Sequence, residues 1–181
     1  MYHLLAASLL IISQIHYIEL APTENYPYSE ALASNYMLYW KYNATHITFE
    51  THVQTHGSVG FGISKTGLMF PADVVVGFVS NNQGTLYDRH TIAHVPPIMD
   101  KSQDWVLLES MQTGNDTVLK FSRALDTNDS EDVPIKAGVT HVIWDFTKTV
   151  PQPPTQVVYH GTNRGSKDIT LINSGGVPVG K

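Results

Sequence analysis

The chain has 181 residues, no cysteine and a formal net charge of −5 with histidine neutral, and 42% of its residues are hydrophobic. This length predicts one domain with appendages, and the apolar fraction is sufficient for a core that needs no disulfide. The mildly acidic charge, without a clustered basic face, argues against nucleic-acid binding, which we do not expect.

The N-terminus carries a nine-residue apolar segment, Leu4 to Ile12. It is too short to span a bilayer and has the length of the hydrophobic region of a secretory signal. We therefore predict a signal peptide over residues 1–20 and a secreted protein, with a buried N-terminal strand or helix as the alternative. No second apolar segment approaches 18 residues, so no membrane span is expected.

Alternation of apolar and polar residues dominates the chain that follows. Residues 36–42 ("YMLYWKY") and 46–54 ("HITFETHVQ") each place apolar side chains on one face, which predicts two half-buried strands joined by a turn at "NAT". In the second strand, Ile47, Phe49, Thr51 and Val53 should face the core, with polar residues on the other side.

Further strands are predicted down the chain. The glycine-rich strand 57–64 precedes a continuous apolar run at 73–80, which pairs with 84–91 across "NNQG". Residues 104–112 and 116–125 form a hairpin, and 137–146 is another alternating strand. About nine short strands, with no long amphipathic helix, predict a β-sandwich or barrel.

Three Asn-x-Ser/Thr triplets begin at Asn43, Asn115 and Asn128. Each falls at an expected turn, where a glycan is tolerated, so they are candidate glycosylation sites. They agree with the predicted secretory route.

The order of motifs "YMLYWKY…ITFETHVQTHGSVGFGIS…GLMFPADVVVGFV…DW…LKFSRAL…HVIWDF" resembles the DOMON domain. More closely, it is similar to the N-terminal domain of the dopamine β-hydroxylase and DBH-like monooxygenase family. The resemblance implies an Ig-like antiparallel β-sandwich over residues 21–150. Residues 151–181 would then be a linker and a C-terminal segment that leads toward copper domains.

The resemblance also implies a function. In that family, copper domains hydroxylate phenylalkylamines with ascorbate and oxygen. We expect this chain to be the non-catalytic, regulatory or metal-stabilised part, with copper only in the downstream domains. The expected partners are copper monooxygenase domains, in cis or in trans, or a second copy of the chain.

A calcium-like cation site is implied by the same resemblance. Asp73 and Asp104 match the two aspartates that hold the cation, and the carbonyls of Val74 and Arg89 match its other ligands. Hard cations accept carboxylate and carbonyl oxygens in flexible geometry. The alternative is that Asp73 accepts hydrogen bonds from backbone amides or pairs with Arg89.

Two other family-level functions remain open. Some DOMON domains are b-type cytochromes, for which Met69 and His160 would be the axial ligands, although we do not expect haem here. A sugar-binding groove could use Tyr36, Trp40, Trp105 or Trp144, which alternation more often places in a core.

The histidines and Arg164 are considered as further functional residues. The nine histidines contain no His-His or His-x-His pair, so we expect no copper site in this chain. Arg164, in "NRG", is expected to pair with a carboxylate of the sandwich.

Overall fold

The structure is a computed structural model that describes residues 20–175, so residues 1–19 of the predicted signal peptide lie outside the described residues. Between residues 20 and 175 it contains strands and no helix. The strands are β1 (Tyr28–Ala33), β2 (Tyr36–Tyr42), β3 (His46–Val53), β4 (Val59–Ser64), β5 (Ala72–Ser80), β6 (Gln83–Thr91), β7 (Ile98–Met99), β8 (Val106–Thr113), β9 (Asp116–Ala124), β10 (Gly138–Phe146) and β11 (Arg164–Ile172).

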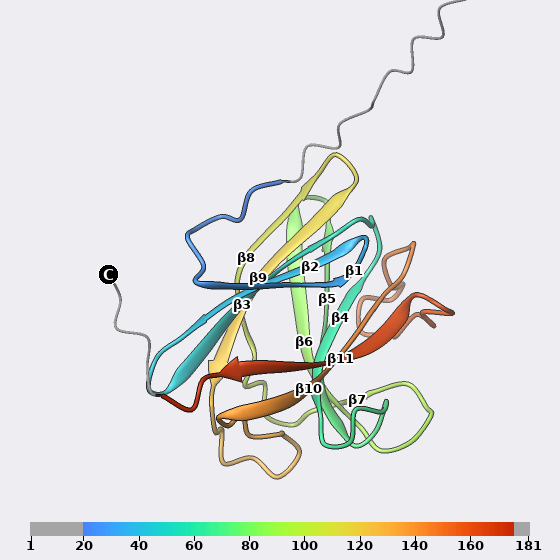
Figure 1. The fold of residues 1–181 in the computed structure, drawn as a ribbon. Coiled ribbons are helices and arrows are strands. Elements are labelled where there is room, and N and C mark those ends of the chain that lie inside the picture. Colours follow the sequence, from blue (N-terminus) through green and yellow to red (C-terminus); the bar gives the residue numbers. More distant parts are fainter. Residues whose placement is uncertain (1–19, 176–181) are drawn as a thin grey trace, which may run out of the picture.

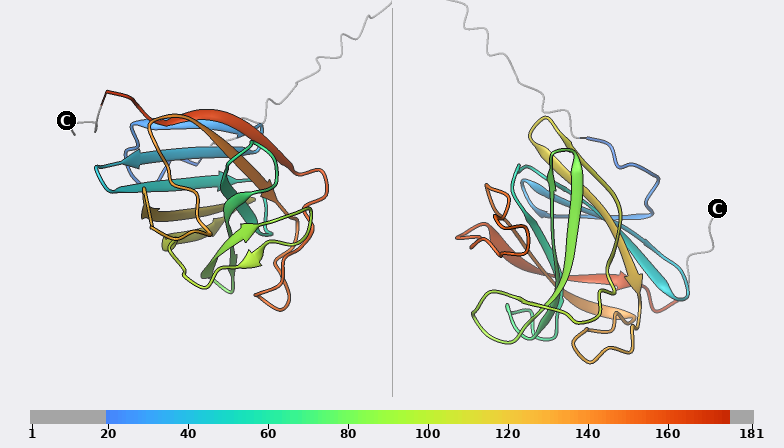
Figure 2. Two further views of the ribbon diagram at one scale, coloured as in Figure 1. Left: turned by 90° about the horizontal axis from the view of Figure 1, so that it is seen from below. Right: turned by 180° about the vertical axis from the view of Figure 1, so that it is seen from behind.

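The strands form two antiparallel sheets. One has the order β1-β2-β3-β9-β8 and the other the order β11-β10-β4-β5-β6-β7. Figure 1 shows them as two layers, with β8 and β9 in one and β10 and β11 in the other, and Figure 2 gives two further views. The prediction of an all-β antiparallel sandwich is confirmed.

Aromatic side chains from both sheets fill the space between the layers. Phe49 of β3 lies 4.7 Å from Phe61 of β4, measured between ring centroids. Trp105, which directly precedes β8, meets Phe61 edge-on at 6.3 Å and Phe121 of β9 at 5.6 Å. All four rings are buried. Burial of side chains between the two sheets explains the sequence patterns of these strands. Apolar residues alternate with polar ones or follow one another without a break in β2 to β5 and in β9.

One glycine explains how β4 approaches the strand that carries Asp73. A Cβ atom at Gly62 would lie 2.6 Å from the Asp73 carbonyl oxygen and 2.5 Å from Cγ1 of Val74. Those distances are too short for any larger residue without a shift of β5. Glycine at position 62 therefore allows the close approach of β4 to β5.

Strand β3 differs from its prediction on its second face. Ile47, Phe49 and Val53 face the core as expected, but Glu50 and His52 on the opposite face are also buried. The cover comes from residues ahead of β1, because Thr23 and Tyr26 donate hydrogen bonds to the Glu50 carboxylate. Glu50 and His52 are therefore buried by pairing and not exposed to water.

The C-terminal boundary of the sandwich also needs correction. We expected the domain to end at residue 150, but β11 pairs with β10 along its whole length and completes the second sheet. Its alternate residues Ile169 and Leu171 are buried, and the indole of Trp40 donates to the Leu171 carbonyl oxygen at 2.9 Å. The short strands β1 and β7 were not expected, so eleven strands lie between residues 20 and 175 where about nine were predicted.

No helix between residues 20 and 175 is both long and apolar enough to cross a membrane.

Candidate metal centre

Asp73 lies at the start of β5 and is fully buried. Its Oδ1 atom accepts a hydrogen bond from the Trp105 indole at 2.8 Å, and its Oδ2 atom accepts from the Val133 amide at 3.4 Å. The same Oδ2 atom forms an ion pair with the guanidinium of Arg123. The partner that offsets the desolvation of this carboxylate is therefore Arg123, and not Arg89 as the alternative interpretation proposed.

Arg123 enters the core from β9 and is itself fully buried. Its Nη2 atom donates to the Val133 carbonyl oxygen at 2.5 Å, and its guanidinium lies 5.0 Å from the centroid of the Trp105 ring. A second carboxylate, Asp132, lies 3.8 Å from its Nη1 atom. This planar cation thereby links β5, β9 and the loop after β9.

Asp88 lies in β6, directly before Arg89, and is buried. Its Oδ2 atom accepts hydrogen bonds from the amides of Asp104 at 2.8 Å and Trp105 at 3.4 Å. Its Oδ1 atom is buried and has no hydrogen-bond partner. The pKa of Asp88 is raised to about 8, chiefly by burial; the two amides lower it, and the nearby charges of Asp132 and Asp100 raise it. A buried carboxylate oxygen without a hydrogen-bond donor is available to accept a proton or a cation.

Three carboxylates converge at this point. Ligand atoms of Asp73, Asp88 and Asp132 all lie within 4.8 Å of one another, and all three residues are buried. If ionised they carry three negative charges against the single positive charge of Arg123. The remaining charge of two matches a divalent cation, and oxygen donors suit a hard one such as Ca²⁺. The residues present therefore fit a hard-cation site.

The predicted site residues are only partly brought together. Val74 and Arg89 are direct partners in the β5–β6 ladder, so their backbones are adjacent. Asp104 joins the cluster through its backbone amide, while its half-buried carboxylate acts on Asp132 by raising the pKa of that group. The side chain of Arg89 points elsewhere and donates to the carbonyl oxygens of Pro97 and Thr155.

The two haem-ligand candidates lie toward opposite ends of β10. Gly67, two residues before Met69, lies beside the ring of His141, whereas His160 acts electrostatically on Asp145. His141 and Asp145 are four positions apart in an extended strand, a distance of about 13 Å. Haem ligation by Met69 and His160 stays an alternative that the visible spectrum tests.

The aromatic candidates for a sugar groove are mostly core residues. Tyr36, Trp40 and Trp105 are buried, and each directs its polar atom to a partner inside the domain. Trp144 is half-buried and packs against Tyr36. Among the described residues these rings do not form an exposed platform.

The predicted glycosylation sites and Arg164 lie at the surface. Asn43, Asn115 and Asn128 are exposed in turns or loops, which leaves glycosylation as a prediction. Arg164 is exposed, and its Nη1 atom donates to the Gly161 carbonyl oxygen, which is a backbone group and not the expected carboxylate.

Arg123 and Asp132 are the residues of this centre that the sequence interpretation missed. Arg123 had a readable signal, since Leu119, Phe121 and Arg123 alternate on one face of β9 and an arginine on a buried face requires an acidic partner. Asp132 had a weaker signal, because the sequence of the "NDSEDV" loop does not show which of its acidic side chains points into the core.

The comparisons place this fold in a family. A family model for the DOMON domain matches residues 32–147. The chain belongs to the DOMON domain family. The cytochrome b domain of pyranose dehydrogenase from Coprinopsis cinerea has a similar fold, with a TM-score of 0.61, 16% identity, and coverage of 75% of this chain and 76% of that one.

Sequence relatives of this DOMON chain are larger proteins. It is 35% identical to mouse DBH-like monooxygenase protein 1 over 155 residues, which cover 84% of this chain and 25% of that protein. MOXD1 homolog 1 of Drosophila melanogaster is 34% identical over 76% of this chain and 21% of its own length. Rat dopamine beta-hydroxylase is 25% identical over 83% of this chain and 25% of its own length. The chain therefore spans about a quarter of the length of these relatives, and the resemblance to DBH-like monooxygenases is confirmed.

Proposed function

We propose that this DOMON domain is a non-catalytic, cation-stabilised regulator or scaffold for copper monooxygenase domains, which are its partners in cis or in trans. By resemblance, those domains would hydroxylate phenylalkylamines. The relatedness to DBH-like monooxygenases over most of the chain supports the assignment of partner. Contact between two copies of the domain is the alternative arrangement.

The observation that carries the stabilising role is the unpartnered Oδ1 atom of Asp88. It lies in a buried group of three aspartates that only Arg123 neutralises. A Ca²⁺ ion bound to Asp88 and Asp132 would supply the missing charge and tie β6 to the loop after β9. Since that loop also holds Val133 against Arg123, the cation would stabilise the end of the sandwich.

Calcium should raise the melting temperature of the purified chain, and Asp88→Asn should abolish that rise. At a calcium concentration of about 100 times the dissociation constant, binding adds about 2.7 kcal/mol to the free energy of unfolding. For a domain of this size that corresponds to a rise of roughly 5–10 °C. Circular dichroism melts with calcium and with chelator measure it.

Asp168→Asn is the matched control, because Asp168 is exposed in β11 and outside the cluster. It should keep the full response to calcium. A wild-type chain that melts at the same temperature with calcium and with chelator would refute the cation site, as would an unchanged response in Asp88→Asn.

We also propose that the protein is secreted and glycosylated. The exposure of Asn43, Asn115 and Asn128 supports this, since an oligosaccharide transferase needs accessible acceptors. Expression in a eukaryotic secretory system should give a protein in the medium whose mass falls on treatment with an N-glycosidase. Retention inside the cell without glycans would contradict the proposal.

The test for haem is the visible spectrum. The likeness to cytochrome domains at 16% identity concerns the fold alone. We expect the purified chain to show no Soret band, and a band lost on replacing Met69 or His160 would favour a cytochrome instead.

A further inference from the structure

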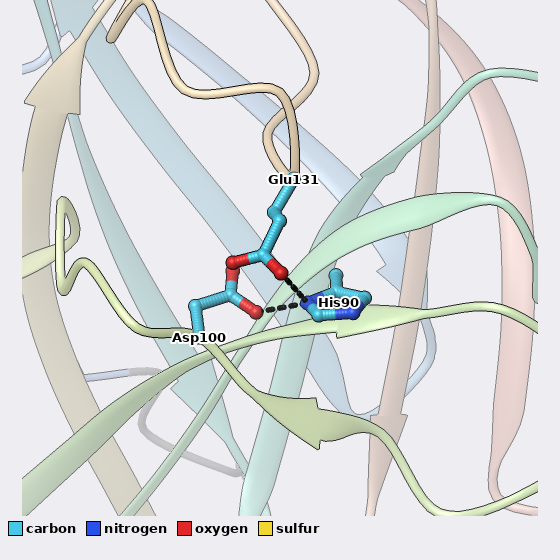
Figure 3. Close-up of side chains that lie close together, drawn as sticks. All are labelled: His90, Asp100 and Glu131. Carbon is cyan, nitrogen blue, oxygen red and sulfur yellow. Dashed lines mark hydrogen bonds and ion pairs between the residues drawn. The ribbon is translucent and has the colours of Figure 1, made fainter.

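We propose that His90, Asp100 and Glu131 form a second metal site, which takes a divalent transition metal such as Zn²⁺. Ligand atoms of these three residues all lie within 4.8 Å of one another. The set is separate from Asp73, Asp88 and Asp132 and does not depend on the calcium proposal. Figure 3 shows the three side chains converging on one point.

Three different elements deliver the ligands. His90 lies near the end of β6, Asp100 directly follows β7, and Glu131 lies in the loop between β9 and β10. The Asp100 amide donates to the Asp88 carbonyl oxygen at 3.1 Å, and the Glu131 amide donates to the Asp129 carboxylate at 2.8 Å. The backbone at both acidic ligands is therefore held in place before any metal binds.

The unpartnered oxygen of Asp100 points to a missing ligand. Its Oδ1 atom bonds to Nδ1 of His90, but its Oδ2 atom is buried and has no hydrogen-bond partner. The Asp100 side chain is only 1% exposed. Figure 3 shows this second oxygen facing an oxygen of the Glu131 carboxylate. Two carboxylate oxygens that face each other without a donor repel unless a cation or a proton lies between them.

The donor set selects the class of metal. One imidazole nitrogen with two carboxylates is a common set for Zn²⁺ and its neighbours, whereas Ca²⁺ takes oxygen ligands. Nδ1 of His90 lies 3.9 Å from Oε1 of Glu131. With metal bonds of about 2.1 Å, the ligand atoms of a tetrahedral Zn²⁺ lie about 3.4 Å apart, so a small rotation of the partly exposed Glu131 side chain would bring both atoms to one ion.

An adjoining cavity provides room for a further ligand. It has a volume of about 240 Å³, and its lining includes His90, Glu131 and Lys65. His90 is 15% and Glu131 28% exposed at the side chain, so the ion can enter from this side. A water molecule or a small anion could complete the coordination there, with Lys65 as a nearby positive charge.

The test is calorimetric titration of Zn²⁺ into the purified chain saturated with calcium. The wild type should bind one tight equivalent, and His90→Gln should weaken this binding by about 100-fold or more, beyond the usual loss from an outer-shell change. Glu131→Gln, at a partly exposed position, should weaken it as well without disturbing the core. Co²⁺ added in place of Zn²⁺ should give a visible absorption band that both variants lose.

His141→Gln is the matched control. His141 also pairs with an aspartate, Nδ1 to Oδ1 of Asp168 at 2.6 Å, but this exposed pair belongs to neither carboxylate cluster. Its loss should leave Zn²⁺ binding unchanged. Equal Zn²⁺ affinity in wild type, His90→Gln and Glu131→Gln would overturn the proposal. The calcium response of His90→Gln should match the wild type, so failure here is distinguishable from failure of the calcium site.

Discussion

Arg123 carries a full positive charge into the core, where Asp73, Trp105 and the Val133 carbonyl surround it. Burial lowers the pKa of Arg123, while Asp132 and Asp126 raise it. The guanidinium remains charged because its ordinary pKa is far above neutral. Removing one partner of such a pair costs more than replacing both, since the other charge is then buried alone.

Arg123→Met should therefore destabilise the domain by about 3–5 kcal/mol, measured by urea unfolding. Arg164→Met, at an exposed arginine, is the control and should change stability by less than about 0.5 kcal/mol. Adding Asp73→Asn to Arg123→Met should recover part of the loss. Equal effects of the two arginine substitutions would contradict a charge-pairing role for Arg123.

At the scale of elements, β3 is held from its outer side by the segment that precedes β1. The Glu50 carboxylate accepts from the Thr23 amide at 2.8 Å and from the Tyr26 hydroxyl at 3.0 Å, and it pairs with Nε2 of His52 at 2.6 Å. Burial alone would raise the pKa of Glu50, but these donors outweigh it and hold the pKa at about 2. These hydrogen bonds hold residues 20–27 against the outer face of β3.

This pairing predicts how stability depends on pH. Because the folded pKa of Glu50 lies below its unfolded value of 4.5, the stabilisation is complete above that value and is lost as the pH falls toward 2. Glu50→Gln should lower the free energy of unfolding by about 1–3 kcal/mol at pH 7 and should flatten its decline between pH 4.5 and 2.

Urea unfolding of wild type and variant at a series of pH values measures both effects. Glu109→Gln, at a half-exposed carboxylate of β8, is the control and should follow the wild-type curve. A parallel decline in wild type and Glu50→Gln would show that another group controls acid unfolding.

At the scale of the whole molecule, β1 and β11 close one side of the sandwich. Lys167 of β11 pairs with Glu30 of β1 and donates to the Ala31 carbonyl oxygen at 3.0 Å. Deeper in, Leu171 of β11 is buried and accepts from the indole of Trp40. Strand β11, which follows residue 150, is therefore part of the hydrophobic core.

A chain truncated after residue 150 should fail to fold cooperatively. It would expose Val142 of β10, which is fully buried, and would leave the Trp40 indole without its acceptor. A chain truncated after residue 175 keeps every described residue and is the control. A cooperative thermal transition in the shorter chain, at the temperature of the control, would contradict this boundary.

Much of this architecture could be predicted from the sequence. Period-two alternation in residues 36–42 and 137–146 located strands, and "NAT" and "NNQG" located hairpin turns, because these signals are local. Strand β1 was not predicted. Residues 28–33 occupy half-buried and exposed positions, so their sequence lacks a clear alternation of apolar and polar residues. The two-residue β7 is too short for any periodicity to be detected.

The sequence by itself determined the fold class, the family motifs and the buried position of Asp73, because hydrophobic patterning and neighbouring residues define them. Only the tertiary structure decided which charges meet. Asp73 and Arg123 are 50 residues apart, and His90 and Glu131 are 41 apart, on strands and loops from both sheets. Electrostatic partners depend on distances through space, which alternation along one strand cannot encode, so both carboxylate clusters emerged only when the two sheets were packed together.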